Sequence, residues 1–182
     1  MSALPTQKLT VDEFLAWAAE QPGRYELYGG TVYAMAPERA GHAGVKFAIQ
    51  TELARAIKKA KVKCHMLPDG MTVRVSEDAA HEPDALVYCG PKVASDTVEI
   101  VSPMIVVEVL SPSTRHIDAS AKLMGYFQLP SVRHYLIVDP NRRPVIHHTG
   151  QADGTILTRL VNTGTIDFDP PGITVDIAKF FP

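Results

Sequence analysis

The stretch that decides the fold is Met104-Ile105-Val106-Val107-Glu108-Val109-Leu110, an apolar run interrupted by one carboxylate. Continuous apolar runs of this length are typical of a central strand that is buried on both faces of its sheet. Pro103 opens the run, and the turn-forming residues Ser111 to Thr114 close it. We therefore expect a buried strand here, with the chain turning directly after it.

Glu108 is the most informative residue of this run. An ionised carboxylate among apolar neighbours costs several kcal/mol unless it is paired or bound to metal. Strand alternation places Val106, Glu108 and Leu110 on one face. Two explanations stay open at this point, namely a buried Glu satisfied by one Lys or Arg, and a metal site.

The sequence on either side of this strand alternates between helical and strand patterns. Helices are expected after the capping box Thr10–Glu13, from Gly41 to Lys59 and from Ile117 to Gln128. Further strands are expected at Arg24–Tyr28, Thr31–Met35, Met71–Val75, Ala85–Tyr88, His134–Val138, Val145–His148, Ile156–Val161 and Ile173–Val175. Gly29-Gly30 joins the first two as a hairpin. This order predicts an α/β (α+β) fold with a mixed sheet flanked by helices, in a single domain over residues 1–182.

Composition limits the class of protein. The 182 residues are 46% hydrophobic and 21% charged, which is ordinary globular usage. No run approaches the roughly 20 apolar residues that span a bilayer, and the N-terminus has neither a basic start nor an apolar core segment, so we expect a cytoplasmic protein with no membrane partner. The net charge of −2 lacks the strongly basic footprint of proteins that hold DNA by bulk electrostatics. Binding to nucleic acid would need a local patch or a metal.

Cys64 and Cys89 are the two cysteines, and they form no CxxC pair. Two thiols in a cytoplasmic domain of this size are typical of reduced structural residues. We expect neither a disulfide nor a structural zinc site.

Asp84 is a second candidate for the chemistry. It follows Glu82-Pro83 and begins an apolar strand, a place where an Asp is by itself most simply a turn or cap residue. Together with Glu108, however, it would form the open, oxygen-rich kind of site that Mg²⁺ prefers.

Lys122 is the best-placed cation, on the helix after the Glu108 strand. Asp118, Lys122 and Tyr126 share one face of that helix, although a surface Asp–Lys pair explains the same spacing. Glu26 is more ambiguous, because the alternation of Arg24, Glu26 and Tyr28 favours an ordinary solvated strand face.

The histidines carry less information. His42 opens the second helix, where it would contact a phosphate or face solvent. The other histidines, His65, His81, His116, His134, His147 and His148, show no metal-binding spacing.

In combination, these motifs resemble the Uma2 family of restriction-endonuclease-like proteins, also called DUF820, in the PD-(D/E)XK nuclease superfamily. The resemblance extends from about Leu9 to Phe181. Its most specific part is Glu108 to Thr114 with Asp118 and Lys122 downstream. The accompanying motifs, in the order of the family, are Arg24–Leu27, His42, Pro83-Asp84, Tyr126 and Tyr135–Pro140.

The resemblance implies a restriction-endonuclease-like core, with an N-terminal helix and hairpin, that cuts DNA using Mg²⁺, with Mn²⁺ as a substitute. It assigns Asp84 and Glu108 as metal ligands. The superfamily motif places a Lys at position 110, which is Leu here, so we infer that Lys122 supplies this charge. Gly29 also departs from the family, which usually has an Asp there. The catalytic residues are then Asp84, Glu108 and Lys122, and the supporting residues are Glu26, His42, Asp118 and Tyr126.

Three functions are compatible with these residues. The leading one is a metal-dependent endodeoxyribonuclease, which we expect to act as a homodimer because nucleases that cut both strands often pair. The second is a catalytically inert nuclease fold that serves as a nucleic-acid-binding or assembly module. The third is a metal hydrolase acting on a small phosphoester.

Overall fold

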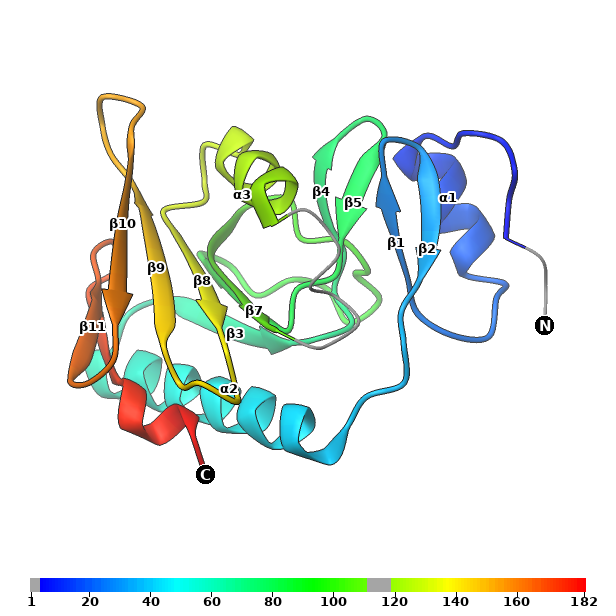
Figure 1. Cartoon of the computed structure of the whole chain (residues 1–182). Coiled ribbons are helices and arrows are strands. Elements are labelled where there is room, and N and C mark those ends of the chain that lie inside the picture. The colour runs from blue at the N-terminus through cyan, green and yellow to red at the C-terminus, as the bar shows by residue number, and fades with distance from the viewer. Residues whose placement is uncertain (1–3, 111–118) are drawn as a thin grey trace.

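The computed structural model describes residues 4–110 and 119–182, which form an α/β fold with helices on both faces of a mixed sheet (Figure 1). The helices are α1 (Val11–Ala18), α2 (Ala40–Ala60), α3 (Ala119–Gln128) and the short 3-10 helix η2 (Ile177–Phe180). The predicted mixed α/β architecture is confirmed.

The main sheet has six strands, and only the pairing of β7 with β8 is parallel. In spatial order its strands are β10 (Ile156–Val161), β9 (Val145–Gly150), β8 (His134–Val138), β7 (Pro103–Val109), β6 (Ala85–Cys89) and β3 (Cys64–Pro68). A second, antiparallel sheet has the order β2 (Thr31–Ala34), β1 (Tyr25–Tyr28), β5 (Ala79–His81) and β4 (Val73–Ser76). The strands β11 (Thr165–Phe168) and β12 (Ile173–Asp176) form a separate pair.

β7 is the central strand that its apolar sequence predicts, because it lies between β6 and β8. Ile105, Val107 and Val109 contribute to the apolar cluster on the α2 side of the sheet. Val106 contributes to the opposite cluster, which contains Tyr126 of α3. The alternation of the strand therefore directs alternate side chains to α2 and to α3.

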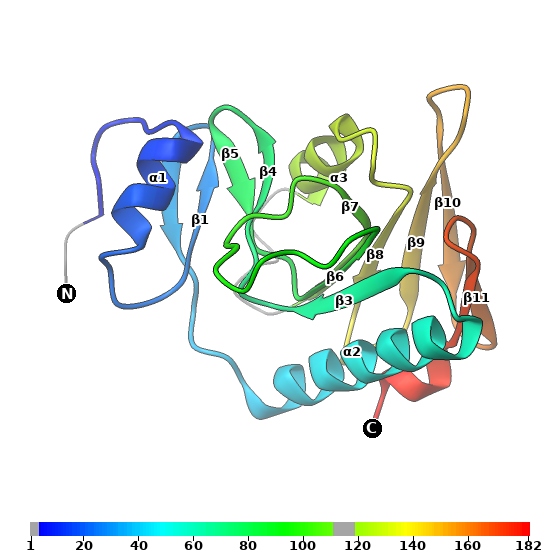
Figure 2. The ribbon, with the colours of Figure 1, turned by 180° about the vertical axis from the view of Figure 1, so that it is seen from behind.

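α2 covers one face of the six-stranded sheet, and α3 lies on the other (Figures 1 and 2). Val45, Ile49 and Leu53 of α2 recur every four residues and are all buried against the sheet. This spacing keeps one stripe of the helix facing the strands, as predicted.

The N-terminal segment forms a smaller layer beside the main sheet. The capping box is present, since Glu13 Oε2 accepts from the Thr10 N–H at 2.8 Å and Thr10 Oγ1 accepts from the Glu13 N–H at 3.3 Å. The β1–β2 hairpin also forms as predicted, with Gly29 and Gly30 at φ of 50° and 75° in its turn. α1 packs on this hairpin through its own apolar cluster.

Three strands were not predicted from the sequence, and one expectation about the chain was wrong. The strands β3, β5 and β11 were not predicted, because β3 and β5 lack a clear apolar alternation and that of β11 covers only four residues. Cys64 and Cys89 form a disulfide, contrary to the expectation of reduced thiols. The register of β3 against β6 places these two residues directly opposite each other, and this pairing is hidden in a sequence where β3 is not recognised.

None of the described helices combines the length and the apolar character needed to cross a membrane.

The packing of α2 predicts a contrast between two of its residues. Leu53 is fully buried, whereas Phe47 on the opposite face is 69% exposed. Leu53→Ala should lower the free energy of unfolding by about 2–5 kcal/mol, because it leaves a cavity under the sheet. Phe47→Ala should change it by no more than about 0.5 kcal/mol. Urea denaturation of both variants measures the contrast, and equal effects would contradict this packing.

Candidate active site

Asp84 and Glu108 lie side by side at the ends of two neighbouring strands. Ala85 pairs with Val107 in the antiparallel register of β6 and β7, so Asp84 comes opposite Glu108. The Asp84 N–H donates to the Val107 carbonyl at 3.0 Å, and Asp84 Oδ2 accepts from the Val109 N–H at 2.7 Å. The backbone of β7 therefore fixes the Asp84 carboxylate beside the Glu108 side chain.

α3 supplies two partners to Glu108. Lys122 Nζ donates to Glu108 Oε1 at 2.7 Å, and the Tyr126 hydroxyl donates to the same oxygen at 2.8 Å. α3 approaches β4 closely because Gly125 lacks a side chain, and a Cβ there would lie 3.2 Å from Val75 Cγ2. This close approach keeps Lys122 and Tyr126 within reach of the sheet.

Glu26 belongs to the same cluster, so its interpretation as a solvated residue was wrong. Glu26 is 3% exposed, and its Oε1 accepts from Lys122 Nζ at 3.0 Å and from the Glu82 N–H at 2.9 Å. Tyr28 donates its hydroxyl to Oε2 at 2.9 Å. β1 is an interior strand, paired with β2 on one side and β5 on the other, and four residues of sequence do not reveal the second neighbour.

A second lysine contacts the other carboxylate. Lys46 of α2 is 5% exposed and ion-paired to Asp84 Oδ1 at 3.3 Å. Its Nζ also lies 2.7 Å from Glu38 Oε1 and 2.7 Å from Asp69 Oδ2. Sequence reasoning missed Lys46, although its position one helical turn after His42 places both residues on one face of α2.

His42 lies where α2 meets the end of β7. Its Nε2 is 2.8 Å from the Val109 carbonyl oxygen and 3.9 Å from Asp84 Oδ2. Its Nδ1 is 2.7 Å from Glu38 Oε1. Both ring nitrogens therefore face oxygen acceptors, and His42 joins the exposed Glu38 to the strand end that carries the two carboxylates.

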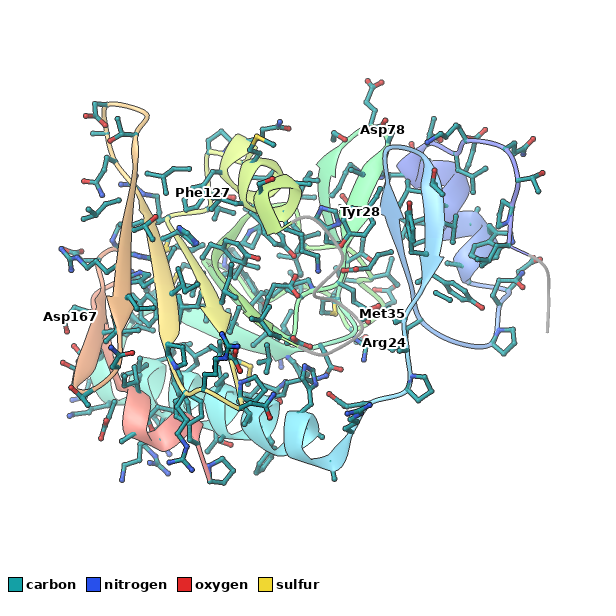
Figure 3. All side chains as sticks on the ribbon, in the orientation of Figure 1. Arg24, Tyr28, Met35, Asp78, Phe127 and Asp167 are labelled. Carbon is teal, nitrogen blue, oxygen red and sulfur yellow. A yellow bond between two sulfur atoms is a disulfide. The ribbon has the colours of Figure 1, made fainter. Side chains whose placement is uncertain are left out.

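Arg24 extends the network to the hairpin. Its Nε donates to Glu82 Oε1 at 2.7 Å, and its guanidinium also pairs with Asp69, the carboxylate shared with Lys46. Figure 3 labels Arg24, Tyr28 and Met35 where the hairpin meets the rest of the molecule. The two lysines thus belong to a network that joins α2, α3, the hairpin and the central strand.

These groups line an open cavity of about 790 Å³. Its walls include the ionisable residues Arg24, Glu26, Glu38, Arg39, His42, Lys46, Glu82, Asp84, Glu108 and Lys122. The ion-paired network contains six carboxyl groups, including Asp69, and three lysine and arginine cations, so carboxyl groups outnumber these cations two to one.

Burial raises the pKa of Glu108 to about 7, and the nearby charges of Glu26 and Asp84 act in the same direction against the opposing effect of Lys122. Burial opposes the charge of Lys122 too, but Glu108 and Glu26 hold its pKa well above the usual value. Burial also works against ionised Glu26, yet Lys122 and the Glu82 N–H bring its pKa below the usual value. The Lys122–Glu26 pair therefore stays ionised, and Glu108 is the carboxyl that takes up a proton near neutral pH.

Asp84 and Glu108 suit a hard, hydrated cation. Within residues 4–110 and 119–182, no group of three or more His, Cys, Asp or Glu side chains is arranged to hold a metal ion. Mg²⁺ commonly binds through one or two carboxylates and keeps several waters, so a pair of adjacent carboxylates on a cavity wall fits its chemistry.

The remaining candidates lie outside this pair. Asp118 falls outside the described residues. His81, which shows no metal-binding spacing in the sequence, is 2% exposed. Its ring centroid lies 4.4 Å from that of Tyr28 and 5.6 Å from that of Tyr126. Burial, aided by Lys122, lowers the pKa of His81 to about 4, so it packs as a neutral ring.

Comparison with known proteins gives one family match. Residues 11–177 match the Uma2 family, which is described as "Putative restriction endonuclease". An uncharacterized protein of Synechocystis sp., slr1290, is 29% identical over 135 residues, which cover 74% of this chain and 70% of that protein.

A solved structure has the same fold. The crystal structure of a putative nuclease of DUF820 from Anabaena variabilis superposes with a TM-score of 0.74 and 14% sequence identity. The superposition covers 95% of this chain and 97% of the other. At 14% sequence identity, this comparison establishes a shared fold and nothing further about the site.

The raised pKa of Glu108 predicts a pH-dependent cost to stability. Between the usual value of 4.5 and about 7, the folded protein binds more protons at this site than the unfolded chain. Stability from this group therefore falls as pH rises through that window. The free energy of unfolding of Glu108→Gln minus that of the wild type should increase from pH 4.5 to pH 8 by about 1–3 kcal/mol without added metal.

Urea denaturation at several pH values measures this difference. Asp12→Asn is the control, because the hydrogen bond from Arg74 lowers the pKa of Asp12 below its usual 3.8 and its effect should be constant above pH 5. A Glu108→Gln difference that is flat or decreasing over the same range would contradict the assigned shift.

Proposed function

Because this chain belongs to the Uma2 family, we propose that it is a metal-dependent endonuclease that hydrolyses phosphodiester bonds of DNA. The observation that carries the proposal is the convergence of Asp84, Glu108 and Lys122 on one open cavity. A purely structural Glu–Lys pair would not need a second carboxylate beside it, nor an opening to solvent.

In this proposal, Asp84 and Glu108 hold Mg²⁺, for which Mn²⁺ substitutes. The bound ion would supply an activated water and neutralise the charge that develops on the phosphate. Asp84 is oriented for this role by the Val109 N–H, and Glu108 by Tyr126 and Lys122. Both carboxylates are thereby held before any ligand arrives, which reduces the reorganisation needed for catalysis.

Lys122 acts through its charge. Because the two carboxylates keep its pKa well above the usual value, Lys122 does not accept a proton from water near neutral pH. A fixed ammonium instead orients water and balances the charge of an incoming phosphate. Glu26 accepts a second hydrogen bond from Nζ and so fixes the direction of the lysine side chain.

The cavity also has features that favour a phosphate backbone. α2 begins at its wall, and the first turn of this helix carries no acidic residue. The positive end of the helix dipole and the nearby Arg39 and His42 therefore face the space where DNA would lie. Together with a bound metal that offsets the carboxylates, these groups would supply the local patch that a chain of net charge −2 requires.

Cleavage assays with supercoiled plasmid, linear duplex and single-stranded DNA, each with Mg²⁺ or Mn²⁺, test the proposal. Glu108→Gln and Lys122→Met should each reduce the cleavage rate by about 10²–10³-fold, because each removes a group that stabilises charge in the transition state. Glu52→Gln is the matched control, since Glu52 is a buried carboxylate that pairs with Arg55 away from the cavity. Its rate should equal that of the wild type.

Cleavage that is the same in all these proteins, or that persists in EDTA, would refute the assignment. Sedimentation of the active protein with and without DNA tests the expected homodimer. Cutting of both strands by a monomer would contradict that expectation.

The inert module is the second candidate, and one observation favours it. Asp84 and Glu108 each contact a lysine, so internal cations already offset part of their charge. In that case the protein should bind DNA equally well with and without Mg²⁺, and calorimetry should detect no metal binding that depends on Asp84 and Glu108.

A further inference from the structure

Lys46 stands out among the cations of the cavity because it contacts a candidate metal ligand and has two stronger contacts elsewhere. Its Nζ lies 3.3 Å from Asp84 Oδ1, but only 2.7 Å from Glu38 Oε1 and from Asp69 Oδ2. Lys122 differs, because its shortest contact is with Glu108 itself, and its other partner Glu26 is buried.

We propose that Lys46 is a counter-ion of Asp84 in the metal-free protein, and that a divalent metal displaces it from Asp84 onto Glu38 and Asp69, which it already contacts. Lys46 thereby controls how tightly the site holds metal. This inference rests on the proposed function for the identity of the metal ligands, and it adds a regulatory residue that the family resemblance does not assign.

The geometry supports such a transfer. Because the two shorter ion pairs persist when the contact with Asp84 is lost, Lys46 does not become an unpaired buried charge, the state that makes broken buried ion pairs costly. Glu38 is partly exposed, so solvent near this carboxylate helps to stabilise the ion pair that it forms with Lys46. Asp84 Oδ2 meanwhile keeps its hydrogen bond from the Val109 N–H, and only Oδ1 changes partner.

The arrangement also explains why a buried lysine next to a metal ligand is tolerated. Without metal, Asp84 would be a desolvated carboxylate beside Glu108, and like charges at such short range disfavour ionisation of both groups. The ammonium of Lys46 relieves this repulsion. With metal bound, the same ammonium would repel the cation, so metal affinity reflects a competition between the two.

Metal binding measured without any substrate tests the proposal. Calorimetric titration of the whole chain with Mn²⁺ at pH 8 and low salt, repeated by electron paramagnetic resonance of free Mn²⁺, gives the dissociation constant. Lys46→Gln should bind Mn²⁺ about 10- to 100-fold more tightly than the wild type, the scale on which partners of metal ligands act. Lys46→Arg keeps the charge and should stay close to the wild type.

Arg24→Gln is the matched control. Like Lys46→Gln, it removes one positive charge from the ion-paired network, but Arg24 pairs with Glu82 and Asp69 and not with Asp84. A general effect of net charge would tighten binding equally in both variants, and this result would overturn the proposal. Unchanged or weaker binding in Lys46→Gln would overturn it as well.

A second pair of variants should weaken Mn²⁺ binding instead of tightening it. This pair also tests the proposal if Lys46→Gln does not fold, which circular dichroism and thermal denaturation would show. Glu38→Gln removes one of the alternative partners of Lys46, so the lysine should hold Asp84 more firmly and Mn²⁺ binding should weaken severalfold. Glu82→Gln removes a carboxylate that pairs with Arg24 instead, and should weaken it less. Equal weakening in both would contradict the transfer.

Asp84→Asn separates this inference from the proposed function. If wild-type binding of Mn²⁺ is lost in Asp84→Asn but unaffected by Lys46→Gln, the metal site stands and the role of Lys46 is refuted. If neither the wild type nor Lys46→Gln binds Mn²⁺, both proposals fail. Binding that appears only in Lys46→Gln would support a counter-ion strong enough to exclude the metal.

Discussion

The structure depends on compensating one carboxylate in its central strand. β7 has to be apolar to lie between β6 and β8, with α2 on one side and α3 on the other, yet it carries Glu108. The compensation comes from Lys122 and Tyr126 on α3, with Glu26 of the hairpin holding the lysine from the other side. The need to satisfy Glu108 therefore joins three segments that are far apart in the sequence, and the same contacts create a pre-organised charged cavity.

The two lysines of the cavity contribute to this site in different ways. Lys122 is almost fully buried between Glu108 and Glu26, so it has no alternative position and its charge is permanent. Lys46 shares its charge among three carboxylates, of which Glu38 is partly exposed. A buried cation that is held in one position keeps its partners precisely oriented, whereas a cation with several partners can lose one contact and keep the others. In the proposed mechanism, positioning by Lys122 and control of metal affinity by Lys46 would therefore come from different helices.

Local patterns in the sequence were sufficient for most of the fold. The apolar run of β7, the four-residue spacing in α2 and the capping box of α1 each act within one segment, and each formed as predicted. The site was predicted less completely, because its partners come together only through tertiary pairing. Glu26 appeared solvated since β5 was not recognised as its neighbour. Lys46 offered only its spacing from His42, and Asp69 carried no signal, since the contact between them joins α2 to the loop after β3. The Cys64–Cys89 disulfide was missed for the same reason.

The position of Lys122 on a helix rather than at residue 110 has a physical rationale. Leu110 follows β7 on the same face as Val106, and it packs against the apolar cluster that contains Tyr126. A lysine at 110 would give up this apolar contact and would approach Glu108 from its own strand. From α3, the ammonium lies over the sheet and contacts Glu108 and Glu26 together. The helix position thus preserves the apolar contact of Leu110 with this cluster and gives the lysine a second carboxylate.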